Sequence, residues 1–197
     1  MFLCEHKLTV TRYAVKILEK KLLTKDTKFR YYKEIEMVSK LICPYIIYLR
    51  EYYEDEERIY IIMEYCAGQS LLESVNKKNK KVETYTERQV AWVMHQLLKA
   101  VSYLHARNII HRDIKAENIM FLDGPPGEGI ARIKLIDFGC ARSFKPHEKM
   151  NGVYGTSNYI APEMISGEYT ESADMFSCGV IFYTMLTMKL PFDDRTD

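Results

Sequence analysis

His111-Arg112-Asp113-Ile114-Lys115-Ala116-Glu117-Asn118 decides how this chain is interpreted, and Asp137-Phe138-Gly139 follows 19 residues after Asn118. Asp113 can accept the proton of an attacking hydroxyl group, and Lys115 can neutralise charge on a phosphoryl group during its transfer. Asn118 and Asp137 offer oxygen ligands of the kind that hold magnesium ions on phosphates. Because phosphoryl transfer depends mainly on positioning and on charge neutralisation, this spacing predicts a phosphoryl-transfer site.

Further motifs surround this stretch in a fixed order along the chain. They are Tyr13-Ala14-Val15-Lys16, Glu34, Met63-Glu64-Tyr65-Cys66, Ala161-Pro162-Glu163 and Asp174. Their content and order resemble the catalytic domain of eukaryotic protein kinases, and the resemblance covers essentially the whole chain. A single motif of this kind occurs by chance, whereas an ordered set does not. The resemblance implies an α+β fold of two lobes, a small strand-rich lobe with one helix and a mainly helical lobe.

The resemblance also implies an ATP site. Lys16 would contact the α- and β-phosphates, and Glu34 would hold Lys16 in place. Glu36 competes for that role, but it lies about 200° further round a helix, so only one of the two can face Lys16. Met63 occupies the gatekeeper position at the start of the hinge. The residues implied for ATP binding are Lys16, Glu34, Met63, Glu64, Cys66 and Met120.

The remaining roles are likewise implied by the resemblance. Asp113 would be the base, Lys115 would neutralise phosphate charge, and Asn118 and Asp137 would hold Mg²⁺. His111 would pack on Phe138 in a hydrophobic column with Val38 and Leu49, as a structural histidine and not as an acid or base. The other residues implied for structure or regulation are Arg112, Gly139, Thr156 beside the acceptor hydroxyl, Glu163 and Asp174.

Two features indicate the subtype. Lys115, two residues after Asp113, and the stretch Gly155–Glu163 resemble serine/threonine kinases. Within that class, Asn108–Phe121 and Gly155–Glu163 are most similar to calcium-dependent and calmodulin-dependent kinases. The same resemblance implies, through Glu117, a preference for substrates with an arginine upstream of the target hydroxyl. Ser70, where kinases with basic substrates often carry glutamate, weakens that preference.

Arg112 bears on regulation. In related kinases, the arginine before the catalytic aspartate binds a phosphate on the activation segment. In this chain, the segment from Ala141 to Gly155 offers only Ser143 and Tyr154 as acceptors. We therefore predict activity that does not depend on phosphorylation of this segment.

Apolar periodicity gives a coarse element order. A strand is predicted over Thr9–Leu18, a helix over Thr27–Ile42, and strands over Tyr45–Tyr53 and Arg58–Glu64. Residues 1–64 are thus expected to form the partial small lobe, and residues 65–197 the hinge and partial large lobe. Further expectations are a charged loop at Lys77–Lys81, a helix opened by a Thr86–Gln89 capping box, a turn between two short strands at Asp123–Gly129, and an apolar helix over about Asp174–Met188.

Composition narrows the function classes. The chain has 197 residues, 47% of them hydrophobic and 28% charged, and a formal net charge of +1. This balance predicts neither nucleic-acid binding nor attraction to anionic membranes. Five scattered cysteines without a Cys-x-x-Cys pair suggest reduced thiols, and no signal peptide or membrane-spanning segment is recognised. We expect a cytoplasmic, or else nuclear, protein.

The chain also departs from the family. The glycine-rich loop over the ATP phosphates should precede Lys16, yet Met1–Val15 contain no glycine. The large lobe should also continue beyond Asp197, so we expect a domain truncated at both ends. The main hypothesis is a kinase that uses ATP and Mg²⁺ on serine or threonine hydroxyls of proteins. The alternative is a non-catalytic, kinase-like fragment or pseudokinase that acts by protein binding.

Overall fold

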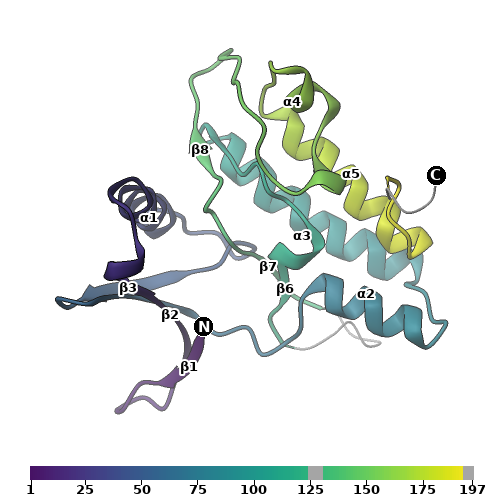
Figure 1. Cartoon of the computed structure of the whole chain (residues 1–197). Coiled ribbons are helices and arrows are strands. Elements are labelled where there is room, and N and C mark those ends of the chain that lie inside the picture. The colour runs from purple at the N-terminus through teal and green to yellow at the C-terminus, as the bar shows by residue number, and fades with distance from the viewer. Residues whose placement is uncertain (124–130, 193–197) are drawn as a thin grey trace.

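The computed structural model describes residues 1–123 and 131–192, which form a strand-rich part and a helical part (Figure 1). The strand-rich part holds a four-stranded antiparallel sheet in the order β1-β2-β4-β3. Its strands are β1 (Phe2–Glu5), β2 (Arg12–Glu19), β3 (Leu49–Glu54) and β4 (Arg58–Glu64). A short 3-10 turn, η1 (Lys20–Leu22), follows β2. The expected α+β architecture is confirmed.

Helix α1 (Lys25–Ser39) packs beside this sheet and carries Glu34. Thr24 caps it, because its side-chain oxygen accepts a hydrogen bond from the Thr27 amide at 3.1 Å. Ile35 and Val38 are buried on its inner face. The predicted helix over Thr27–Ile42 is therefore present, but it begins and ends a few residues earlier.

Residues 45–47 do not extend β3, as the predicted strand over Tyr45–Tyr53 required. They bond instead to β7 (Ile133–Leu135) of the helical part. The Leu135 amide donates to the Tyr45 carbonyl at 2.8 Å, and the Ile47 amide donates to the Leu135 carbonyl at 3.0 Å. This stretch thus joins the two parts of the molecule before the chain enters the sheet.

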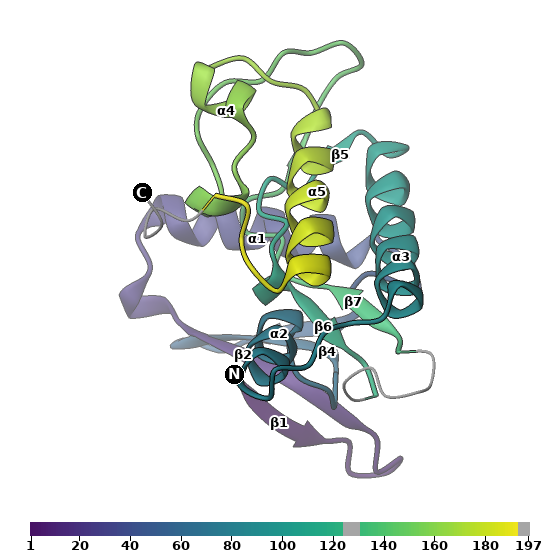
Figure 2. The same cartoon turned by 90° about the vertical axis from the view of Figure 1, so that its right-hand side faces the viewer.

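The helical part is built on α3 (Glu87–His105) and α5 (Ser172–Thr187), which lie side by side (Figure 2). Leu97, Leu104, Ile181 and Met185 are fully buried in its core. Smaller elements complete the part: α2 (Leu71–Lys80), α4 (Pro162–Ser166), η2 (Ala116–Asn118), η3 (Ser157–Tyr159), and the strand pairs β5 (Ile109–Ile110) with β8 (Arg142–Ser143) and β6 (Ile119–Phe121) with β7.

Local expectations for this part had mixed outcomes. The Thr86–Gln89 capping box is confirmed at the start of α3. The charged loop predicted at Lys77–Lys81 is wrong, because Lys77–Lys80 form the last turn of α2. That helix starts at a second capping box, Ser70 with Glu73, and basic side chains suit a helix C-terminus. The expected turn at Asp123–Gly129 falls largely outside the described residues.

The most apolar helix is α5, with Cys178, Val180 and Ile181 buried. Within residues 1–123 and 131–192, no helix combines the length and hydropathy that a bilayer crossing needs.

Candidate active site

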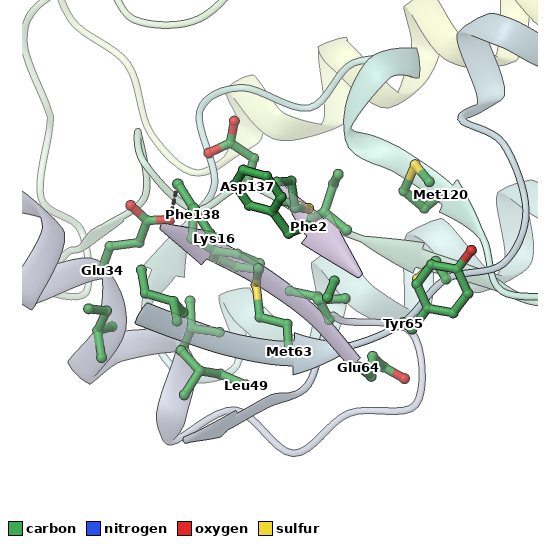
Figure 3. Close-up of a pocket in the computed structure, with 18 of the residues that line it drawn as sticks. Phe2, Lys16, Glu34, Leu49, Met63, Glu64, Tyr65, Met120, Asp137 and Phe138 are labelled. Atoms are coloured by element: carbon green, nitrogen blue, oxygen red, sulfur yellow. Dashed lines mark ion pairs between the residues drawn. The ribbon is translucent and has the colours of Figure 1, made fainter. Parts of the chain in front are cut away.

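A cavity of about 500 Å³ lies between the sheet and the helical part (Figure 3). Its wall is mostly apolar, and the polar side chains of Lys16, Glu34 and Asp137 gather at the end opposite Tyr65 and Met120. The cavity is lined in addition by Met1, Phe2, Leu3, Ala14, Ile35, Val38, Ile47, Leu49, Ile61, Met63, Glu64, Cys66, Ile136 and Phe138. An apolar slot with a few convergent charges at one end has the form of a small-molecule site.

Lys16 and Glu34 meet across this cavity. Lys16 projects from β2 and Glu34 from α1, and Lys16 Nζ lies 3.8 Å from Glu34 Oε1. Burial raises the pKa of the Glu34 carboxyl, and the Asp137 charge raises it further, while Lys16 lowers it. The competitor Glu36 instead pairs with Lys40 on the exposed face of α1. The geometry therefore selects Glu34 as the partner of Lys16.

The stretch expected to be the hinge, Met63-Glu64-Tyr65-Cys66, covers the last two residues of β4 and the two that follow. Glu64 is engaged away from the cavity charges, because its Oε1 lies 2.7 Å from Lys134 Nζ and accepts a hydrogen bond from the Tyr48 amide at 2.6 Å. Burial raises the pKa of the Cys66 thiol to about 11, so this thiol is neutral at physiological pH. Sequence reasoning missed Lys134, whose side chain is buried although it carries a charge.

Sequence reasoning also missed part of the cavity wall. Leu3 of β1 pairs with Ala14 of β2, and both line the cavity. Ala14 in turn pairs with Met63 of β4. The signal for Ala14 was available, since it precedes Lys16 by two residues and must point to the same face of a strand. No local pattern identified the strand that carries Leu3.

A closed ring of hydrogen bonds surrounds the Asp113 carboxylate. Lys115 Nζ lies 2.9 Å from Asp113 Oδ2 and donates to Thr156 Oγ1 at 2.8 Å. Thr156 Oγ1 in turn donates to Asp113 Oδ1 at 3.0 Å. Burial lowers the pKa of Lys115, but the hydrogen bond and the charge of Asp113 outweigh it, and the net shift is upward. Lys115 therefore stays charged beside the carboxylate.

Asn118 completes this group from η2. Its amide Nδ2 donates to the Asp113 carbonyl at 2.8 Å and to Asp113 Oδ2 at 3.2 Å. The Asn118 carbonyl accepts a hydrogen bond from the Ile136 amide at 2.9 Å, which places Asn118 next to the strand that leads to Asp137. The two implied magnesium ligands therefore lie at the same end of the β6–β7 pair, Asn118 directly before β6 and Asp137 two residues after β7.

Asp137 has a left-handed backbone with φ +62°, and its Oδ1 accepts a hydrogen bond from the Gly139 amide at 3.2 Å. A Cβ atom at Gly139 would lie 3.2 Å from Asp137 Oδ1 and 3.8 Å from Glu34 Oε2, so glycine leaves the carboxylate free of crowding. One carboxylate and one amide suit magnesium that takes its other ligands from phosphates and water. Among the described residues, no cluster of three or more His, Cys, Asp or Glu side chains forms a closed metal cage.

Asp174, in the first turn of α5, binds the main chain of the stretch that leads to Asp113. This carboxylate, 1% exposed, accepts hydrogen bonds from the amides of His111 and Arg112, both at 2.9 Å. It also lies 2.9 Å from His105 Nε2. Arg112 has φ +66°, an unfavourable backbone for a non-glycine residue that these contacts compensate.

His111 is fully buried and packs its ring edge-on against Phe138, with 4.9 Å between ring centres. Burial lowers the pKa of His111, so the ring is neutral at physiological pH. Val38 and Leu49 belong to the same buried core as Phe138. These positions match the expected structural role of His111.

Three residues singled out from the sequence, Glu117, Glu163 and Ser70, have still to be placed in the structure. One oxygen of Glu117, in η2, is buried and has no hydrogen-bond partner among the described residues. Burial of such a group is costly unless a ligand satisfies it. Glu163 lies in the first turn of α4 and is half-buried. Ser70 is occupied as the cap of α2, through its capping box with Glu73.

Comparisons with known proteins give one family. The family model described as "Protein kinase domain" matches residues 1–197. Calcium-dependent protein kinase 3 of Plasmodium yoelii yoelii is 40% identical over 192 residues, which cover 97% of this chain and 34% of that protein. Calcium/calmodulin-dependent serine/threonine-protein kinase 1 of Oryza sativa subsp. japonica is 35% identical over 186 residues, covering 93% of this chain and 30% of that protein. The chain thus spans about a third of the length of these relatives.

Proposed function

The chain belongs to the protein kinase family, and on that premise we propose that the protein transfers the γ-phosphate of Mg-ATP to serine or threonine hydroxyls of proteins. The observation that carries the proposal is the ring formed by Asp113, Lys115 and Thr156. It presents a carboxylate acceptor and a cation at one point, which in-line transfer to a hydroxyl requires.

Each member of the ring has a defined task. Asp113 accepts the proton of the attacking hydroxyl while the oxygen bonds to phosphorus. Lys115 stays charged and neutralises the transferring group. Thr156 holds the side chains of Asp113 and Lys115 in register, since its hydroxyl donates to one and accepts from the other.

The nucleotide would occupy the 500 Å³ cavity. Lys16, positioned by Glu34, would contact phosphates, while Met63, Cys66 and Met120 would contact the base. Because the Glu64 carboxylate is held by Lys134, Glu64 would contribute through its main chain. Bound Mg²⁺ would supply further charge neutralisation, and Asn118 and Asp137 are the residues suited to hold it. Residues 1–64 would then act as the small lobe and residues 65–197 as hinge and large lobe.

Glu117 supports a preference for substrates with an upstream arginine. Its unpartnered buried oxygen would be satisfied by a guanidinium, which donates in a planar fork. The names of the relatives associate those proteins with calcium or calmodulin. Five free cysteines and a net charge of +1 support a reducing compartment, cytoplasm or nucleus, and a protein partner over nucleic acid.

The test combines a thermal melt with a transfer assay. Mg-ATP should raise the melting temperature, since a ligand at about 100 times its dissociation constant stabilises the native state by about 2.7 kcal/mol. The chain should phosphorylate serine and threonine peptides with an upstream arginine, and not the matched tyrosine peptides.

Asp113→Asn is the matched variant. It should keep the Mg-ATP shift and lose at least about a hundredfold in transfer rate, the usual contribution of a positioned base. A wild-type chain that binds Mg-ATP but transfers nothing would favour the non-catalytic alternative. Retained transfer in Asp113→Asn would refute the assigned base.

A further inference from the structure

The Arg112 side chain joins three loops. Its guanidinium carbon lies 3.8 Å from the centre of the Tyr154 ring. Its Nε donates to the Cys140 carbonyl at 2.6 Å, and its Nη1 donates to the Tyr169 hydroxyl at 3.3 Å. Since the Arg112 amide is itself bound to Asp174, one residue connects the catalytic stretch, the loop after Gly139 and the segment that leads to Thr156.

The partners of this guanidinium are neutral throughout the described residues: a carbonyl, a hydroxyl and an aromatic face. Tyr154 lies on the wall of a groove of about 860 Å³ between α1 and this segment. This groove is lined by more basic than acidic side chains, and two of the basic ones are paired, Lys40 with Glu36 and Arg142 with Glu148. The cations that line it are Arg30, Lys33, Lys40, Arg107, Arg112 and Arg142. The electron-rich face of a tyrosine is a favourable partner for a cation in such a place.

The backbone around Tyr154 is shaped for this stacking. Gly152 has φ +92°, and a Cβ there would approach the Tyr154 ring to 3.0 Å. Gly155 has φ +96°, and a Cβ there would lie 2.6 Å from the Arg112 carbonyl oxygen. Both glycines therefore permit the ring to fold back and the segment to touch the catalytic stretch directly.

The next residue in the chain is Thr156, which closes the hydrogen-bond ring on Asp113 and Lys115. Only Gly155 separates Tyr154 from Thr156, so the position of Tyr154 restricts where the Thr156 backbone can lie. The stacking of Tyr154 on Arg112 is thus a side-chain contact that fixes the chain two residues before Thr156. We call this contact the anchor.

We propose that Tyr154 is a positioning residue of the active site, whose ring, stacked on Arg112, holds Thr156 against Asp113 and Lys115 without any phosphate on the segment. This inference rests on the proposed kinase activity and names the device that orders its site. It assigns the work to the ring of Tyr154 and not to its hydroxyl.

The test uses the full chain, freed of phosphate by a phosphatase and verified by intact mass. Tyr154→Ala should lower kcat by about fivefold, the rate equivalent of one solvent-exposed cation–π contact, with KM for Mg-ATP changed less than about twofold. Tyr154→Phe keeps the ring and should restore the rate that Tyr154→Ala loses. Val153→Ala, at an exposed neighbouring position, is the matched control and should change neither constant.

Hydrogen exchange of the backbone amides separates this inference from the activity itself. Tyr154→Ala should speed exchange over residues 141–156 by about tenfold and leave α3 unchanged, whereas Tyr154→Phe should exchange like wild type. If the wild-type chain transfers no phosphate but the exchange difference is found, the kinase proposal fails and the anchor stands.

Three outcomes overturn the anchor. One is equal exchange in the alanine and phenylalanine variants, whatever the activity. Another is a phenylalanine variant as slow in transfer as the alanine variant, which would assign the work to the hydroxyl. The third is wild-type protein that is active only with a phosphate on Ser143 or Tyr154.

Discussion

On the helical side of the cleft, Asp113 is bound by Lys115, Thr156 and Asn118, and Asp174 is bound by two main-chain amides and His105. Across the cleft, Lys16 and Glu34 stand 3.8 Å apart. Facing them from the helical side, two residues after β7, Asp137 accepts only a 3.2 Å hydrogen bond from the Gly139 amide among the contacts that the described residues supply. We call the first group the catalytic wall and the second, Lys16, Glu34 and Asp137, the nucleotide wall.

The difference separates two ways of preparing a site. The catalytic wall is ordered by the fold itself, so its geometry exists before any ligand arrives. The nucleotide wall keeps charges that are only loosely paired, and on the proposed function these charges would meet phosphates and magnesium. Substitutions in the first wall should therefore cost stability, and substitutions in the second should cost function with little loss of stability.

The largest stability effect is expected at Asp174. Asp174→Ala leaves the buried amides of His111 and Arg112 without an acceptor, and each unsatisfied buried donor costs about 1–3 kcal/mol. We expect the free energy of unfolding in urea to fall by about 3 kcal/mol or more. Met175→Ala, at the exposed next position of α5, is the control and should change it by less than about 0.5 kcal/mol. Similar losses in both variants would mean that the loss at Asp174 does not come from its hydrogen bonds to the two amides.

Lys16→Met should show the reverse profile. Loss of a cation aimed at the phosphates should lower kcat by at least about a hundredfold. The free energy of unfolding should change by about 1 kcal/mol or less, since the 3.8 Å pair with Glu34 is partly solvated. Lys21→Met, an exposed lysine just after β2, controls for charge and should leave kcat unchanged. A loss of stability as large as that of Asp174→Ala would erase the contrast between the walls.

Lys134→Met tests the stretch proposed as the hinge, through the ion pair of Lys134 with Glu64. The variant removes the counter-charge of a largely buried Glu64 carboxylate that also orders the Tyr48 amide. We expect the dissociation constant for Mg-ATP to rise by about tenfold or less while kcat at saturation is kept, because the catalytic wall is untouched. The double variant Lys134→Met with Glu64→Gln should recover most of the affinity. An equally weak double variant would show that Lys134 acts through packing and not through Glu64.

The sequence predicts most reliably the features that depend on residues close together in the chain. Motif spacing predicted Asp113, Lys115, Asn118 and Asp137 as one site, and the hydrogen bonds among the first three show that the fold brings them together. The Thr86–Gln89 capping box predicted the start of α3 correctly. The catalytic roles of Asp113, Lys115 and Asn118 remain predictions, whereas their proximity is now a structural fact.

Long-range contacts could not be predicted in the same way. Lys134 and Glu64 lie 70 positions apart, and their ion pair depends on how residues 45–47 join β7 to the sheet. β1 has no alternating pattern and is a strand only because β2 pairs with it. The lysines at the end of α2 suggested a loop because helix propagation from the Ser70 cap is invisible in the charges alone.

The smallest expected effect is at Glu34, where function and stability should move in opposite directions. Burial raises the pKa of this carboxyl in the folded state, so the folded protein holds the proton more tightly than the unfolded chain. The contribution to stability is then fully present below the unfolded-state pKa and is lost as the pH rises through the folded-state pKa. Glu34→Gln carries no such dependence, so it should gain stability relative to wild type as the pH rises from about 4 to 8, while kcat falls.

Glu36→Gln, two positions along the same helix, provides a control of opposite sign. The hydrogen bond and charge of Lys40 lower the pKa of Glu36, so its contribution is present above the unfolded-state pKa and is lost as the pH falls. Glu36→Gln should therefore be slightly less stable than wild type near neutral pH, and this difference should vanish in acid. Urea unfolding of wild type, Glu34→Gln and Glu36→Gln between about pH 4 and 8 measures the direction of both stability changes. If Glu34→Gln also loses stability at neutral pH, the Lys16–Glu34 pair stabilises the folded state. The nucleotide wall would then contribute to stability as the catalytic wall does.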